Sequence, residues 1–205
     1  MQKELQRIYF TIDDLNSVFA ISLVEKPAIE SDFQYFSETE VQKFTILDKE
    51  KRIVVGPILI PEFWMLRKNP KTDEYFEAAF SVQTIEDIAF KYLKDSNQAN
   101  VTIQHQFNAT DICLVESWIV DNPEMDKSTA LGFSVPKGTW MGTMKLSNDG
   151  WVEYVKTGLV KGFSVEGKFL HQIVEMQEVI LTEDEILLEE VKKILNNFDK
   201  NECQS

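Results

Sequence analysis

The sequence Gly158-Leu-Val-Lys-Gly-Phe-Ser-Val-Glu-Gly-Lys168 joins the end of a helix-like run to a short strand-like run. The strand-like run, Phe163 to Val165, has a glycine on each side. Glycine has no side chain and accepts unusual dihedral angles, so Gly162 and Gly167 allow a sharp turn and the close approach of a ligand. A serine at this place, Ser164, acts as a nucleophile if a general base reaches its hydroxyl.

One of the two histidines is the candidate base. His105 lies in Val101-Thr-Ile-Gln-His-Gln106, where strand alternation places it on the same face as Val101 and Ile103. A lone histidine on such a face is more often a packed structural residue than a base. The function of Ser164 therefore depends on whether His105 reaches it.

Glu116 is the candidate carboxylate partner of His105. It lies in the apolar run 112–119, where a carboxylate is costly to bury without a partner. If 101–106 pairs with 112–118 in a hairpin around 108–111, Glu116 lies opposite or diagonal to the His105 region. Two alternatives remain: Glu116 faces solvent, or Asp111 in the turn is the partner.

Three further residues compete for these roles. Ser134 repeats the Gly-Phe-Ser-Val context at 132–135, but it precedes a proline and is expected in a loop. His171 alternates within a strand-like run and is expected to pack or to face solvent. Cys113 lies between apolar residues and is expected to be a small core residue, because a reactive thiolate needs an electropositive setting.

Composition limits the classes of function. The chain has 205 residues, 43% of them hydrophobic, which suits one globular domain. A formal net charge of -13 argues against nucleic acid and an anionic membrane surface as partners. No run approaches the roughly 20 apolar residues of a membrane span, and two distant cysteines, Cys113 and Cys203, do not form a disulfide framework. We expect a soluble intracellular protein.

The sequence also lacks the common metal and cofactor motifs. The two histidines are far apart, and there is no Cys-x-x-Cys, no His-Glu-x-x-His, no phosphate-binding loop and no dinucleotide fingerprint. We expect neither a cofactor nor a metal.

The pattern of apolar residues predicts many short strands and three helices. A helix over 84–93 has Ile85, Ile88, Ala89, Tyr92 and Leu93 on one face and a capping box from Thr84 to Asp87. The other helices are predicted over 149–157 and 182–198. Strands are predicted twice within 6–24, then over 52–60, 74–82, 101–106, 112–120 and 136–146, and once or twice within 163–179.

This order shows no regular alternation of strands and helices. We therefore predict an α+β fold with an antiparallel β-barrel-like core and surrounding helices. Residues 1–180 would form the main domain. Residues 181–205 would form a C-terminal amphipathic helix, which packs on its own domain or docks on another chain, and a short tail.

The order of the motifs resembles the prohead (capsid maturation) serine proteases of tailed phages, whose fold is related to that of the herpesvirus assemblin. The resemblance covers roughly residues 18 to 170. It rests on the following segments: the His105 strand, Leu114-Val-Glu-Ser-Trp-Ile119, Val135-Pro-Lys-Gly-Thr-Trp140, the short helix with Trp151 and Val155, Thr157-Gly-Leu-Val-Lys-Gly-Phe-Ser-Val-Glu-Gly167, and the early Ala20-Ile-Ser-Leu-Val-Glu-Lys-Pro-Ala28.

The resemblance implies a catalytic site and a role. Ser164 would be the nucleophile, His105 the general base and Glu116 the third member of the triad. Asp111 is an alternative third member, and so is His171, as in the Ser-His-His arrangement of the herpesvirus relatives.

The implied activity is a serine endopeptidase that cleaves scaffold and major capsid precursor proteins inside the assembling prohead, in the host cytoplasm. A homo-oligomer is an open alternative to a monomer. The alternative function is a non-enzymatic head scaffold or assembly protein that keeps the protease fold.

Overall fold

The computed structural model describes residues 5–25, 43–69 and 72–173. These residues belong to one compact unit, Met1–Val174. Its strands are β1 (Gln6–Thr11), β2 (Val18–Val24), β3 (Thr45–Asp48), β4 (Ile53–Leu59), β5 (Met65–Lys68), β6 (Tyr75–Phe80), β7 (Val101–Ile103), β8 (Phe107–Ala109), β9 (Ile112–Ile119), β10 (Trp140–Leu146), β11 (Gly162–Gly167) and β12 (Leu170–Ile173). Its helices are α1 (Val82–Lys94), α2 (Lys127–Ala130) and α3 (Asn148–Gly150), with a 3-10 turn η1 (Asn97–Ala99) and a π-helical turn η2 (Trp151–Val155).

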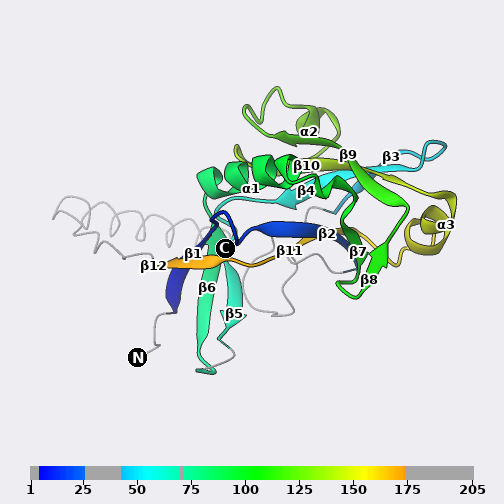
Figure 1. The fold of residues 1–205 in the computed structure, drawn as a ribbon. Coiled ribbons are helices and arrows are strands. Elements are labelled where there is room, and N and C mark those ends of the chain that lie inside the picture. Colours follow the sequence, from blue (N-terminus) through cyan, green and yellow to red (C-terminus); the bar gives the residue numbers. More distant parts are fainter. Residues whose placement is uncertain (1–4, 26–42, 70–71, 174–205) are drawn as a thin grey trace, which may run out of the picture. The chain divides into compact units, whose positions relative to one another are not determined.

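The strands form three four-stranded sheets (Figure 1). Their orders are β12-β1-β6-β5, β3-β4-β10-β9 and β11-β2-β7-β8. The pairs β1–β6 and β2–β7 are parallel, and the other pairs are antiparallel.

The predicted fold class is wrong. The protein is mostly β, and in the described residues the three sheets stay open instead of closing into an antiparallel barrel with surrounding helices. The error has a physical reason: a count of short strands does not say which strands pair, because pairing is fixed by packing between residues far apart in sequence.

The predicted hairpin of 101–106 with 112–118 is also wrong. β9 pairs with β10 in the second sheet, whereas β7 pairs with β2 and β8 in the third. The chain reverses at Gln104 and His105, where the Gln106 N–H donates to the Ile103 carbonyl at 3.0 Å. The two strands that were expected to bring His105 and Glu116 together therefore lie in different sheets.

Helix α1 has the buried face that its sequence predicts. Ile85, Ile88, Ala89 and Tyr92 are buried, and the Tyr92 ring meets the fully buried Trp140 ring edge-on at 5.5 Å. The helix packs against β2, β9 and β10. These contacts place α1 over the sheets that share the main hydrophobic core.

The beginning of α1 differs from the prediction. Its N-cap is Ser81, whose Oγ accepts a hydrogen bond from the Thr84 N–H at 3.1 Å, so the capping box from Thr84 to Asp87 is wrong. The predicted helix 182–198 and the end of the predicted strand region 163–179 lie outside the described residues.

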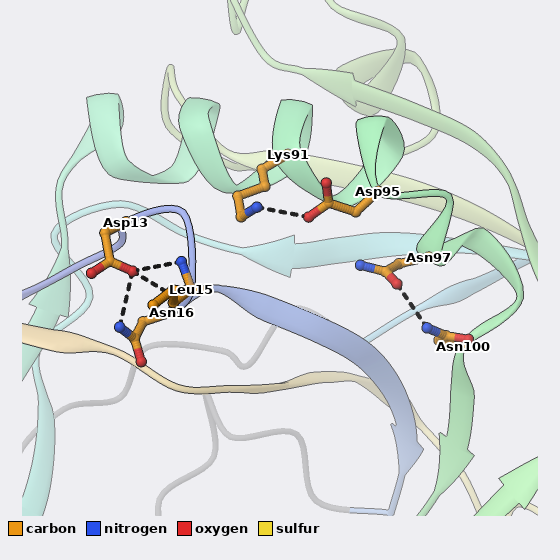
Figure 2. Close-up of polar contacts among 7 residues, drawn as sticks. All are labelled: Asp13, Leu15, Asn16, Lys91, Asp95, Asn97 and Asn100. Carbon is orange, nitrogen blue, oxygen red and sulfur yellow. Dashed lines mark hydrogen bonds and ion pairs between the residues drawn. The ribbon is translucent and has the colours of Figure 1, made fainter.

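Short polar contacts lie in the loop before β2 and in the segment that precedes β7 (Figure 2). Before β2, one carboxylate oxygen of Asp13 accepts from the backbone N–H groups of Leu15 and Asn16 at 2.9 and 2.7 Å. Beside β2, the backbone carbonyl of Asn100 accepts a hydrogen bond from the Ile21 N–H at 3.1 Å. The amide side chain of Asn100 donates to Asn97 at 2.7 Å. The bond from Ile21 to Asn100 lies at the start of the paired region of β2 and β7.

Candidate active site

One face of the third sheet carries a row of small polar residues. In the strand register, Ser164 of β11 lies opposite Ser22 of β2, Ser22 lies opposite Thr102 of β7, and Thr102 lies opposite Asn108 of β8. Directly opposed residues share a face of the sheet, so the four side chains form one row. Ser22 is fully buried and Ser164 is 3% exposed.

The glycines around Ser164 act differently from the prediction. Neither Gly162 nor Gly167 has a positive φ, and both belong to β11. A side chain at Gly167 would come within 2.9 Å of the Ser17 carbonyl oxygen and 3.1 Å of the Val18 Cα atom. Glycine is required there by the close approach of the neighbouring backbone. The positive φ of 72° belongs to Gly158, in the turn before the strand.

His105 lies in a tight turn between β7 and β8. Gln104 and His105 both adopt the left-handed conformation, with φ of 52° and 57°. Gln104 and His105 are the central residues of the four-residue turn 103–106, and two positive φ values there match a type I′ turn, which usually contains asparagine, aspartate or glycine. The turn brings His105 back over the sheet face that carries Thr102.

The carboxylate beside His105 is Glu166, which the sequence reasoning missed. The His105 Nδ1 atom lies 3.2 Å from Glu166 Oε1, with side-chain exposures of 42% and 22%. The Thr102 hydroxyl donates to the same oxygen, Oε1. A signal was available in the sequence: Glu166 follows Ser164 by two residues, and alternate residues of a strand share one face.

The structure places Glu116 in a different environment. Glu116 lies on β9, where its carboxylate is paired with the Lys127 ammonium group and accepts from the Thr143 hydroxyl at 2.8 Å. The hydrogen bond from Lys127 lowers the pKa of Glu116 below its usual value. The structure thus brings His105 together with Glu166, and it gives Glu116 two partners of its own.

The other residues considered for the site have different surroundings from those of His105 and Glu166. The Asp111 carbonyl accepts from the Ser147 N–H at 2.9 Å. The His171 ring, on β12 of the first sheet, lies 5.4 Å from the Phe10 ring. Ser134 is exposed between two buried residues, and Cys113 is a half-buried free cysteine on β9.

Within residues 5–25, 43–69 and 72–173, no group of three or more His, Cys, Asp or Glu side chains is arranged to hold a metal ion. In the same ranges no helix is long and apolar enough to cross a membrane.

Comparison with protein families places the chain in a known family. The model of a protein family described as "Putative phage serine protease XkdF" matches residues 40–175, which is more than half of the chain and includes His105, Ser164 and Glu166. The chain belongs to this family of phage serine proteases. Comparison with curated proteins gives no match, and comparison with solved structures gives none either.

Proposed function

We propose that the protein is a serine endopeptidase with Ser164 as nucleophile, His105 as general base and Glu166 as the carboxylate that orients the base. The observation that carries the proposal is the 3.2 Å contact between His105 Nδ1 and Glu166 Oε1, in the sheet whose strand β11 also holds Ser164. Membership of a phage serine protease family supports the reaction type.

The contact with Glu166 decides which nitrogen of His105 acts. When Nδ1 carries its proton toward the Glu166 carboxylate, the other ring nitrogen, Nε2, holds the free lone pair. Nε2 takes the hydroxyl proton of Ser164 as Oγ attacks the scissile carbonyl carbon, and it gives that proton to the leaving amine as the C–N bond breaks. Water then attacks the acyl-enzyme by the same route and releases the free carboxylate.

The substrates we propose are scaffold and major capsid precursor proteins, cut inside the assembling head in the host cytoplasm. This part is supported by the resemblance of the ordered motifs to prohead proteases and by the phage origin of the matching family. Incubation of the purified protein with head precursor proteins, followed by mass spectrometry of new N-termini, tests it. Precursors that stay intact beside a protein that labels at Ser164 would contradict the substrate assignment and leave the hydrolase assignment standing.

Labelling with a serine-directed fluorophosphonate tests the reaction type. We expect one label per chain, on Ser164, and no label on the Ser164→Ala variant. Ser134→Ala is the matched control, because Ser134 has the same Gly-Phe-Ser-Val context but lies outside the third sheet. Labelling that depends on Ser134 would show that the nucleophile is wrongly chosen.

The second candidate function is a non-enzymatic head assembly protein that keeps the protease fold. The burial of Ser164, at 3% exposed, favours it, because a nucleophile must meet its substrate. A protein that never labels and never cleaves precursors, but whose Ser164→Ala variant supports normal head assembly, would establish this second function.

A further inference from the structure

We propose that Ser22 is a positioning residue of the candidate active site, whose buried hydroxyl fixes the backbone of His105. The inference rests on the proposed function of His105 as the general base. It concerns a residue of β2 that lies outside the part of the chain matched by the family, residues 40–175.

Ser22 occupies the centre of the polar row. It lies between Ser164 on one neighbouring strand and Thr102 on the other, and it is fully buried. Its Oγ accepts a hydrogen bond from the His105 N–H at 2.9 Å and lies 3.4 Å from the Thr102 carbonyl oxygen, to which it donates. One hydroxyl thus satisfies a backbone donor and a backbone acceptor next to the site.

The His105 backbone needs such an anchor. At φ 57° it adopts a conformation that non-glycine residues rarely take, and Gln104 before it does the same at φ 52°. Strained backbone of this kind persists only where surrounding contacts hold it. The Ser22 hydroxyl supplies one of these contacts directly at the residue that carries the imidazole.

Gln104 holds the same turn from its other side. Its N–H donates to the Leu23 carbonyl at 2.9 Å. Its side chain accepts from the Glu25 N–H at 3.2 Å and donates to the Leu159 carbonyl at 3.2 Å. Because these bonds remain when Ser22 is changed, we expect the turn to form without the Ser22 hydroxyl, but with His105 less tightly placed.

The imidazole position then depends on two hydroxyls. Thr102 fixes the Glu166 carboxylate, and Ser22 fixes the His105 backbone from which the ring reaches that carboxylate. Ser22 has no role in taking or giving the catalytic proton. Its loss therefore lowers the rate of the chemical step and leaves substrate binding unchanged, because small misplacements of a catalytic group slow the reaction.

The test compares Ser22→Ala, Ser22→Cys and Ser17→Ala. Ser17→Ala is the matched control: Ser17 is also nearly buried, precedes the same strand, and its Oγ has no hydrogen-bond partner in the described residues. For peptide cleavage we expect kcat to fall about tenfold in Ser22→Ala with KM unchanged, since a hydrogen bond contributes about that factor. Ser22→Cys keeps a weak acceptor of similar size, so its kcat should lie between that of Ser22→Ala and that of the wild type.

The outcomes separate this inference from the proposed function. Wild-type protein that labels with a fluorophosphonate, together with Ser22→Ala that cleaves at the wild-type rate, overturns the role of Ser22 alone. A fall in kcat of equal size in Ser17→Ala overturns it too, because the effect would then be general loosening. Wild-type protein that neither labels nor cleaves overturns the proposed function and the inference together. If Ser22→Ala does not fold, the kcat of Ser22→Cys is compared with that of the wild type and of Ser17→Ala instead.

Discussion

His105 Nδ1 faces Glu166 Oε1 at 3.2 Å. The neighbouring hydrogen bond from Thr102 to Glu166 joins two residues that are 64 positions apart in the sequence. We expect Glu166→Gln to keep the fold and to lower kcat on the order of 10⁴-fold, because an amide leaves the histidine in the wrong tautomer. Glu116→Gln is the control, and we expect near-normal kcat, since the Glu116 carboxylate is bonded to Lys127 and Thr143. The reverse ranking in a peptide cleavage assay would restore Glu116 as the third member of the triad.

The effects of His105 and Ser164 substitutions should be far from additive. His105→Ala and Ser164→Ala should each lower kcat by about a million-fold, and the double variant should be no worse than either, because the two residues act as a unit. Single-turnover cleavage of a peptide measures all three. Additive losses would show that His105 and Ser164 contribute through separate steps.

The Glu116–Lys127 pair gives a pH dependence of stability. The pKa of Glu116 is lowered in the folded protein, chiefly by the Lys127 hydrogen bond. Its contribution is therefore present above the ordinary glutamate pKa of about 4.3 and is lost as the pH falls through the lower folded-state pKa. The side chains are 42% and 41% exposed, so solvent screening limits the contribution to about 0.5 kcal/mol.

The corresponding experiment is urea unfolding of the wild type and Glu116→Gln at pH 7 and pH 3. We expect the wild type to be slightly more stable than Glu116→Gln at pH 7, and this difference in the free energy of unfolding to be smaller at pH 3. A difference of the same size at both pH values would mean that the Glu116 side chain stabilises the fold without its charge.

Gly167→Ala should destabilise the protein and also slow the labelling of Ser164. The added methyl group meets the Ser17 carbonyl and the Val18 Cα atom, so β11 must shift against β2, at a cost of about 1–3 kcal/mol. Gly158→Ala is a contrasting variant, because no atom lies within 4 Å of the added group and the cost, about 1 kcal/mol, comes from its φ of 72° alone. Urea unfolding measures both costs, and we expect slower labelling only for Gly167→Ala.

Ser81→Ala should lower the free energy of unfolding by about 1 kcal/mol, because it removes the N-cap bond to the Thr84 N–H. Asp87→Asn should change it by less than about 0.5 kcal/mol, since the Asp87 carboxylate accepts an exposed hydrogen bond from the Gln83 side chain. Thermal or urea unfolding distinguishes the two positions. A larger loss at Asp87 would restore the capping box that the sequence suggested.

Local patterns predicted the elements that depend on local chemistry. The β-branched run at 53–59 and the apolar face of α1 gave the right strand and helix, because periodicity reports which side is buried. No strand was predicted between 60 and 74, and β5 (Met65–Lys68) was therefore missed, since its charged Arg67 and Lys68 hide the strand pattern.

The site could be predicted only in part, because its geometry depends on an unusual turn. Asn108 and Asp111 are common turn formers, and for that reason the sequence predicts the hairpin around them. The real turn uses Gln104 and His105 in left-handed conformations, which residues of these types rarely adopt. The contact of His105 with Glu166 depends on that turn and on the pairing of β2 with both β7 and β11. A short stretch of sequence predicts neither the turn conformation nor the strand pairing.

The strand order β11-β2-β7-β8 has a consequence for the synthesis of the protein. β2 is made before β7, and the His105 backbone, 83 residues after Ser22, bonds to it. Glu166 arrives 64 residues after Thr102. Because a ribosome adds about 5–20 residues per second, a nascent chain spends seconds with β2 and β7 available but without the edge strand that brings Ser164 and Glu166. A growing or truncated chain that lacks β11 therefore has neither Ser164, the proposed nucleophile, nor the Glu166 carboxylate for His105.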